Sequence, residues 1–154
     1  MQSSFREVAS IRAATPHAAW SPMADAGRDE QPRRRRILVV EDEALVAMAT
    51  SQLLEDAGYE VVGMAADSRQ ALRLAEDERP DLVLMDIRLR GGDDGVATAA
   101  EIRKQLGLPV LYVSAHGDSA TLARAAQTSP AGFVGKPHTT DELLRAVGRA
   151  LGAN

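Results

Sequence analysis

Acidic, hydroxyl and basic side chains directly follow short apolar segments at four places in the chain. Glu41 and Asp42 follow the segment ILVV, and Asp86 follows LVLM. Ser114 follows VLYV, and Lys136 follows GFVG. Carboxylates that cluster repel one another unless one is protonated or a cation binds between them. If these residues meet, they would form a cation site that is flanked by a hydroxyl and an ammonium group.

A donor set made only of oxygen atoms favours Mg²⁺, which commonly takes one or two carboxylates, retains water and accepts phosphate oxygens. Such a cation would bring a phosphoryl group to Asp86, whose carboxylate can act as a nucleophile and form an acyl phosphate. The Ser114 hydroxyl and the Lys136 ammonium would contact the oxygens of the added group. Each residue alone has a simpler interpretation as a loop residue or a surface charge, so the chemistry requires that they lie together.

Short apolar segments alternate with segments of helical periodicity from residue 37 onward. This alternation predicts an α/β fold with a doubly wound parallel sheet that is covered by helices on both faces. In such sheets, sites form outside the carboxyl ends of the strands, near the change in strand order. All the candidate residues follow strands and therefore belong at this edge. The expected strands are 37–40, 59–64, 82–85, 110–113 and 132–134, and the five expected helices are 44–57, 68–78, 95–105, 118–127 and 140–151.

Local patterns also predict how individual helices begin and which side they bury. Ser68 is the expected N-cap of the second helix. Thr139, with Glu142 three residues later, predicts a capping box at the start of the last helix. The first helix repeats apolar residues at helical spacing, as the buried side of an amphipathic helix does. These apolar residues are Leu45, Met48, Ala49 and Leu53.

The overall composition is that of a single soluble domain. Hydrophobic residues make up 45% and charged residues 26% of the 154 residues, and only 3% are aromatic, so aliphatic side chains must form the core. The absence of cysteine excludes disulfides and thiolate chemistry. It is compatible with a reducing cytosol, and we expect a cytoplasmic protein. No apolar run approaches the roughly 20 residues that are needed to cross a bilayer.

Charge divides the chain into two parts. Residues 1–36 carry seven arginines and four acids, whereas residues 37–154 carry 11 basic and 18 acidic residues. The acidic body argues against direct binding of nucleic acid, which needs a cationic surface. Residues 1–35 are expected to be a flexible N-terminal extension. Met23 offers a second translation start, which leaves open whether residues 1–22 are made in the cell. A solvated flank is the simpler interpretation of the run Arg33–Arg36, with an anion-binding patch as the alternative.

The sequence resembles the receiver domain of two-component response regulators over about residues 36–151. The matching motifs are ILVVEDE, DLVLMD, YVSA and GFVGKP, which occur in family order with nearly family spacing. The resemblance implies a CheY-like, flavodoxin-like fold with strand order 2-1-3-4-5, followed by a short tail at 152–154. It also implies that the Lys136–Pro137 bond is cis.

The resemblance further implies roles for the candidate site residues. Asp86 would be the phosphoacceptor, and Lys136 would contact the phosphoryl group. Ser114 would be the switch hydroxyl that moves toward the phosphate, and Phe133 the switch aromatic that turns inward with it. The implied Mg²⁺ ligands are Asp42, Asp86 and the backbone carbonyl of Arg88, with Glu41 acting through water.

The implied phosphodonor is a sensor histidine kinase or a histidine phosphotransfer protein. Because little sequence follows the last helix, we expect a stand-alone receiver that signals by changed partner binding or by phosphorelay. It would not be an enzyme beyond catalysing its own phosphorylation and dephosphorylation. A downstream protein or a second copy would bind the face formed by the fourth helix, the fifth strand and the fifth helix. The apolar residues expected there are Leu122, Phe133, Leu143, Leu144 and Val147, with burial in the core as the alternative for most of them.

Several features depart from the family pattern. Arg90 stands where many relatives have proline, and the following loop, GGDDG, is one residue longer, which predicts a more flexible or reshaped loop. His116 lies where relatives tune the lifetime of the phosphoryl group. Two alternatives remain: a pseudo-receiver that binds partners without phosphorylation, and a phosphatase that forms an aspartyl phosphate. Arg88 disfavours the phosphatase, because such enzymes often carry a second acid at that position. A function as a nucleotide carrier is disfavoured, because the sequence has no glycine-rich phosphate-binding loop after the first strand.

Overall fold

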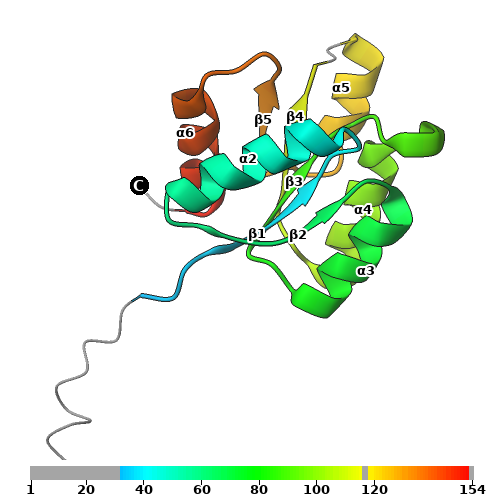
Figure 1. Ribbon diagram of the computed structural model, residues 1–154. Helices are drawn as coiled ribbons and strands as arrows, with labels where there is room; N and C mark the ends of the chain where they lie inside the picture. Colours follow the sequence, from blue (N-terminus) through cyan, green and yellow to red (C-terminus); the bar gives the residue numbers. More distant parts are fainter. Residues whose placement is uncertain (1–31, 116–117, 153–154) are drawn as a thin grey trace, which may run out of the picture. The chain divides into compact units, whose positions relative to one another are not determined.

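The computed structural model describes residues 32–115 and 118–152. The predictions for residues 1–31 and for His116 therefore lie outside the described residues. Five parallel strands form one sheet in the order β2-β1-β3-β4-β5 (Figure 1). This confirms the predicted sheet and its strand order. The strands are β1 (Arg36–Val40), β2 (Glu60–Ala65), β3 (Leu82–Met85), β4 (Val110–Ser114) and β5 (Gly132–Gly135).

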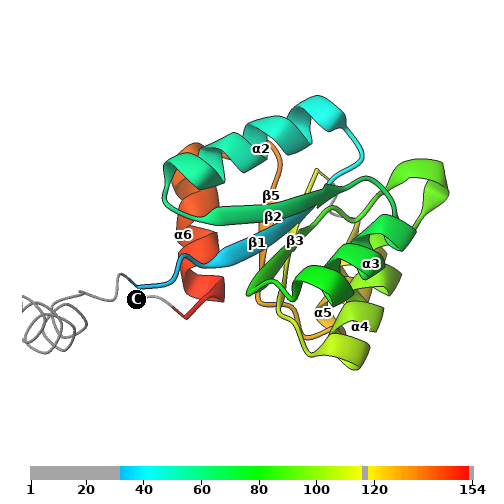
Figure 2. The same cartoon turned by 60° about the horizontal axis from the view of Figure 1, so that its bottom comes forward.

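Helices cover both faces of the sheet, as the alternating pattern predicts. Helices α2 and α6 lie on one face and α3, α4 and α5 on the other (Figure 2). A single 3₁₀ turn, η1, lies in the loop between β3 and α4. The helices are α2 (Ala44–Asp56), α3 (Ser68–Glu78), α4 (Gly95–Leu106), α5 (Ser119–Ala126) and α6 (Thr140–Ala150), and η1 spans Arg90–Gly92. None of the helices within the described ranges is long and apolar enough to span a membrane.

The central strands are buried on both faces, which explains why their sequences are continuous apolar runs rather than alternating ones. In β3, Val83 and Met85 pack toward α3, α4 and α5, whereas Leu82 and Leu84 pack toward α2 and α6. All four side chains are almost completely buried. A buried strand of this kind holds the residue that follows it, Asp86, at a fixed position.

The buried side of α2 differs from the prediction. Leu45 is 81% exposed and Met48 is 57% exposed, and the buried residues of this helix are Ala47, Ser51 and Leu54. The small side chains of Ala47 and Ser51 allow the helix to lie close to the sheet. Leu45, Met48 and Ala49 are left exposed on the outer side, so the predicted apolar stripe was wrong at these three positions, while Leu53 is partly buried.

One predicted helix start is confirmed and another is wrong. In α6, Thr139 Oγ1 accepts a hydrogen bond from the Glu142 amide, and the Glu142 carboxylate accepts one from the Thr139 amide, which confirms the capping box. In α3 the N-cap is Asp67, whose carboxylate accepts a hydrogen bond from the Gln70 amide at 2.9 Å. Ser68 is the first helical residue instead.

The predicted partner face is only partly apolar at its surface. Leu122 and Phe133 are 36% and 40% exposed, but Leu143 and Val147 are fully buried in the core between α6 and the sheet. Leu143 and Val147 are therefore core residues and cannot contribute to a partner surface, which corrects that part of the prediction.

Two arginines near the start of β1 make structural contacts with the domain. A guanidinium nitrogen of Arg35 donates a hydrogen bond to the carbonyl of Leu151 at 2.8 Å. The Arg36 guanidinium donates to the carboxylate of Glu78 at 2.8 Å. These contacts join the segment that leads into β1 to the last turn of α6 and to the end of α3.

Candidate functional site

The backbone at the carboxyl edge of the sheet continues its hydrogen-bond pattern beyond the strands. The Glu41 amide donates to the Ala65 carbonyl at 2.9 Å, and the Asp86 amide donates to the Val40 carbonyl at 3.0 Å. The Lys136 amide donates to the carbonyl of Ser114 at 3.0 Å. Residues that follow different strands are thereby held in register at one edge, as the sequence predicts.

Three carboxylates meet at this edge. Glu41, Asp42 and Asp86 each offer an oxygen atom, and these atoms lie within 4.8 Å of one another. Glu41 is buried, with 7% of its surface exposed, while Asp42 and Asp86 are half-buried. A set of carboxylate oxygens without nitrogen or sulfur donors fits a hard cation such as Mg²⁺. The expected acidic cluster is therefore present.

Lys136 joins two of these acids. Its Nζ lies 2.5 Å from Oε2 of Glu41 and 3.3 Å from Oδ2 of Asp86. Burial raises the pKa of Glu41, and the charge of Asp86 adds to this effect, against the opposing hydrogen bond from Lys136. Burial alone would lower the pKa of Lys136, but its contacts with Glu41 and Asp86 outweigh burial and raise it. One ammonium thus contacts two of the three clustered carboxylates, which leaves negative charge for a cation to neutralise.

Arg88 contacts the site through its backbone. Its amide donates to Oδ1 of Asp86 at 3.2 Å, so that the two carboxylate oxygens of Asp86 have different partners, Arg88 and Lys136. Arg88 also pairs with Asp94 in an isolated antiparallel bridge. The role of the Arg88 carbonyl as a metal ligand stays a prediction.

The two predicted switch residues lie on β4 and β5. Ser114 is buried at the last position of β4, on the same edge as Asp86. Phe133 is partly exposed on β5, and its ring centroid lies 5.1 Å from that of Tyr112. The predicted movements of Ser114 and Phe133 are not tested by a single conformation. The Lys136–Pro137 bond is cis, as expected.

Gly95 is a site residue that the sequence analysis did not identify. Its amide donates to the Ile87 carbonyl at 2.7 Å, and a Cβ at this position would lie only 1.9 Å from the Asp86 carbonyl oxygen. The first residue of α4 therefore packs directly on the backbone that follows β3. The local signal in the sequence is a glycine at the start of a predicted helix, since glycine suits places where another group approaches the backbone closely.

Comparison with known proteins gives a consistent result. The model of the response regulator receiver domain family matches residues 37–148. The chain is 35% identical to the transcriptional regulatory protein PdtaR of Mycobacterium tuberculosis over 117 residues, which covers 76% of this chain and 57% of PdtaR. It is 32% identical to the chemotaxis protein CheY of Bacillus subtilis, covering 75% of this chain and 97% of CheY. The chain thus spans little more than half the length of PdtaR.

Solved structures agree with the sequence relatives. The signal receiver domain of a modulated diguanylate cyclase from Desulfovibrio desulfuricans G20 superposes with a TM-score of 0.73 at 37% identity, covering 78% of this chain and 95% of that domain. The family match extends from the β1 segment to α6 and includes every residue of the acidic cluster. The chain therefore belongs to the receiver domain family of two-component response regulators.

Proposed function

We propose that Asp86 accepts a phosphoryl group from a phosphohistidine of a sensor histidine kinase or a histidine phosphotransfer protein. The observation that carries this proposal is the position of its carboxylate, beside two further acids and 3.3 Å from the Lys136 ammonium. The protein would then signal by changed partner binding or by passing the phosphoryl group onward.

In the proposed transfer, a carboxylate oxygen of Asp86 attacks phosphorus and forms an acyl phosphate bond while the phosphorus–nitrogen bond to histidine breaks. The leaving imidazole nitrogen keeps the electron pair and takes up a proton. Lys136 contacts the oxygens of the transferred group, because its Nζ already lies beside Asp86, and the Ser114 hydroxyl would contact them from β4. Mg²⁺ bound by Asp42, Asp86 and the Arg88 carbonyl, with Glu41 acting through water, would neutralise charge on these oxygens.

The phosphodonor would dock beside the site on the start of α2. The helix begins at Ala44, directly after the acidic segment 41–43. Leu45 and Met48 expose large apolar side chains on the same helix. Exposed apolar side chains next to a reactive group suit a partner that must bring its phosphohistidine to Asp86. A downstream protein or a second copy would use the surface around Leu122 and Phe133.

The test is phosphorylation of the purified protein by a small-molecule phosphodonor, with and without Mg²⁺, followed by intact-mass measurement. The native protein should gain the mass of one phosphoryl group only when Mg²⁺ is present, and Asp86→Asn should gain none. Asp56→Asn is the matched control, because Asp56 lies at the far end of α2, away from the acidic cluster. A native protein that gains no mass in Mg²⁺ would refute the proposal and favour a pseudo-receiver.

A further inference from the structure

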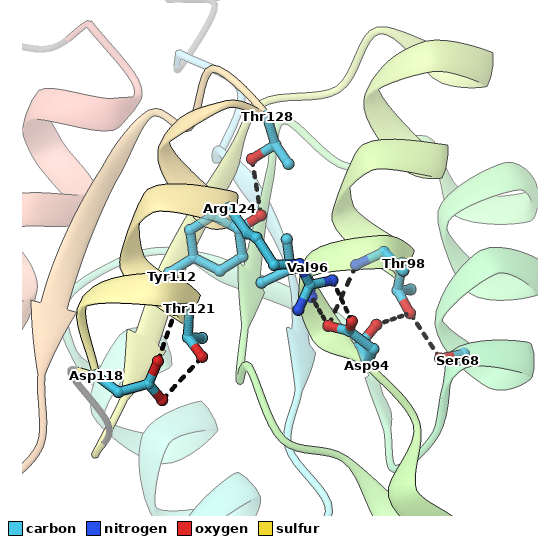
Figure 3. A network of polar contacts seen from close by, with 10 residues as sticks. Ser68, Asp94, Val96, Thr98, Tyr112, Asp118, Thr121, Arg124 and Thr128 are labelled. Atoms are coloured by element: carbon cyan, nitrogen blue, oxygen red, sulfur yellow. Dashed lines mark hydrogen bonds and ion pairs between the residues drawn. The ribbon is translucent and has the colours of Figure 1, made fainter.

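Asp94 joins two helices at the end of the loop that follows the phosphoacceptor. Its Oδ1 accepts hydrogen bonds from the amides of Val96 at 2.9 Å and Ala97 at 3.4 Å, and thereby caps the start of α4. Its Oδ2 forms an ion pair with the guanidinium of Arg124, which reaches across from α5 (Figure 3). One carboxylate therefore contacts both the beginning of α4 and the last turn of α5.

The backbone of Asp94 is connected to Asp86. Asp94 pairs with Arg88 in the isolated antiparallel bridge, and the Arg88 amide donates to Oδ1 of Asp86 at 3.2 Å. The neighbouring Gly95 amide donates to the Ile87 carbonyl at 2.7 Å. A short series of direct contacts thus leads from Arg124 through Asp94 and Arg88 to the proposed phosphoacceptor.

The same ion pair also lies between the segments that follow two of the strands at the site, β3 and β4. Helix α5 begins at Ser119, a few residues after Ser114 at the end of β4, whereas Asp94 ends the loop that follows β3. Asp118 caps α5 by accepting a hydrogen bond from the Thr121 amide at 2.7 Å. The Arg124–Asp94 pair therefore links the segment after Ser114 to the segment after Asp86.

The exposure of the pair indicates that overall stability is not its main contribution. The side chains of Arg124 and Asp94 are 54% and 38% exposed, and ion pairs at such positions contribute little to folding. We propose that Arg124 is a positioning residue, which through Asp94 holds the loop from Arg88 to Asp94 in the arrangement that binds Mg²⁺ beside Asp86. This inference rests on the proposed function of Asp86 as phosphoacceptor.

A purely electrostatic role and a positioning role of Arg124 predict opposite changes in Mg²⁺ affinity when its guanidinium is removed. If the guanidinium acted only through its positive charge, Arg124→Gln would remove a repulsion and tighten the binding of Mg²⁺. If it positions the loop, the same substitution would weaken the binding, because the Arg88 carbonyl and Asp86 would no longer be held in place. The direction of the change therefore separates a positioning role from a simple field effect.

The test is a double-mutant cycle with Mg²⁺ affinity measured by isothermal titration calorimetry. Arg124→Gln and Asp94→Asn should each raise the dissociation constant, by at most about fivefold for an exposed pair. Asparagine is also a good N-cap, so Asp94→Asn preserves the start of α4. The double variant should be no worse than either single variant, because the two residues act as one pair, and Arg124→Lys should restore part of the affinity. Arg103→Gln on α4 is the control for losing one nearby positive charge.

A second measurement, made without metal, distinguishes failure of the proposed phosphoacceptor function of Asp86 from failure of the proposed positioning role of Arg124. In Mg²⁺-free protein, hydrogen exchange of the Gly95 amide should be faster in Arg124→Gln than in Arg103→Gln. Native protein that neither binds Mg²⁺ nor becomes phosphorylated would refute the proposed function, and the exchange of Gly95 would still decide whether Arg124 holds the loop. Native protein that binds Mg²⁺ while Arg124→Gln binds it equally or more tightly, with unchanged Gly95 exchange, would refute the positioning role alone.

Discussion

Replacing Gly95 with alanine should destabilise the protein, because the added methyl group has no room beside the backbone after β3. The new Cβ would lie 1.9 Å from the Asp86 carbonyl oxygen and 2.8 Å from both the Cα and the carbonyl oxygen of Ile87. Real Cβ atoms essentially never come closer than 3.0 Å to another heavy atom. The start of α4 and the residue that follows β3 would therefore have to separate by about 1 Å.

The magnitude follows from the kind of atom that is displaced. Overpacking usually costs about 1–3 kcal/mol, and here the obstacle is backbone, which cannot rotate away as a side chain can. The separation would also strain the 2.7 Å hydrogen bond from the Gly95 amide to the Ile87 carbonyl. We therefore expect Gly95→Ala to lower the free energy of unfolding by about 3 kcal/mol, which corresponds to a decrease in Tm of about 10 °C in a domain of this size.

Urea denaturation and thermal unfolding followed by circular dichroism measure this effect. The matched control is Gly135→Ala in β5, because a Cβ at Gly135 would meet no heavy atom within 4 Å. That variant should unfold within about 0.5 kcal/mol of the native protein. If Gly95→Ala were equally stable, the close packing of α4 on the Asp86 backbone would be wrong.

Four further substitutions test the acidic cluster and the orientation of α2. Asp42→Asn should raise the unfolding free energy of the metal-free protein by about 0.5–1 kcal/mol, because repulsion between carboxylates is relieved. The same substitution should reduce the stabilisation by Mg²⁺ that thermal unfolding detects in the native protein. Because burial raises the pKa of Glu41 above 4.5, its contribution to stability is fully present below pH 4.5 and is lost as the pH rises through the folded-state pKa. The metal-free Glu41→Gln variant should therefore not show this decrease in the free energy of unfolding when denaturation is measured between pH 4.5 and neutrality. Leu45→Ala should change stability by less than about 0.5 kcal/mol, whereas Leu54→Ala should cost about 2–5 kcal/mol, since Leu45 is exposed and Leu54 is buried.

The sheet and the composition of the acidic cluster could be predicted because both depend on local sequence. A strand that is buried on both faces must be a short apolar run, and all four side chains of LVLM in β3 are buried. The carboxyl ends of parallel strands share one edge, so the sequence predicts that Asp86 lies beside Glu41 and Asp42. The prediction placed Lys136 at this edge as well, but not its contacts with Glu41 and Asp86.

The orientation of α2 could not be predicted, because its sequence offers apolar residues on more than one side. Leu45 and Met48 repeat at helical spacing, but so do Ala47, Ser51 and Leu54, which are the buried ones. Hydrophobicity alone favours burial of the larger side chains, whereas the structure buries the smaller Ala47 and Ser51 together with Leu54. Which side of the helix is buried is decided by tertiary packing and has no local pattern in the sequence.

The loop GGDDG could not be interpreted from its sequence for a related reason: its partners are distant in the chain. Gly91 and Gly92 adopt positive φ angles of 72° and 78°, which glycine tolerates, and they turn the chain within η1. Asp93 then accepts a hydrogen bond from the Ser68 amide at 3.0 Å, Asp94 pairs with Arg124, and Gly95 packs on the backbone of Asp86.

Three consecutive residues of this loop thus contact α3, α5 and the end of β3. The segment GGDDG therefore has a separate partner at each of these three positions, rather than being a segment without tertiary contacts. Asp93 and Asp94 belong to the loop that follows Asp86, and they contact Ser68 and Arg124. Substitutions at Ser68 or Arg124 should therefore alter the site, although neither residue is a proposed ligand. Ser68 and Asp93 are 25 residues apart in the sequence, and Asp94 and Arg124 are 30 residues apart, which explains why no local pattern could reveal this dependence.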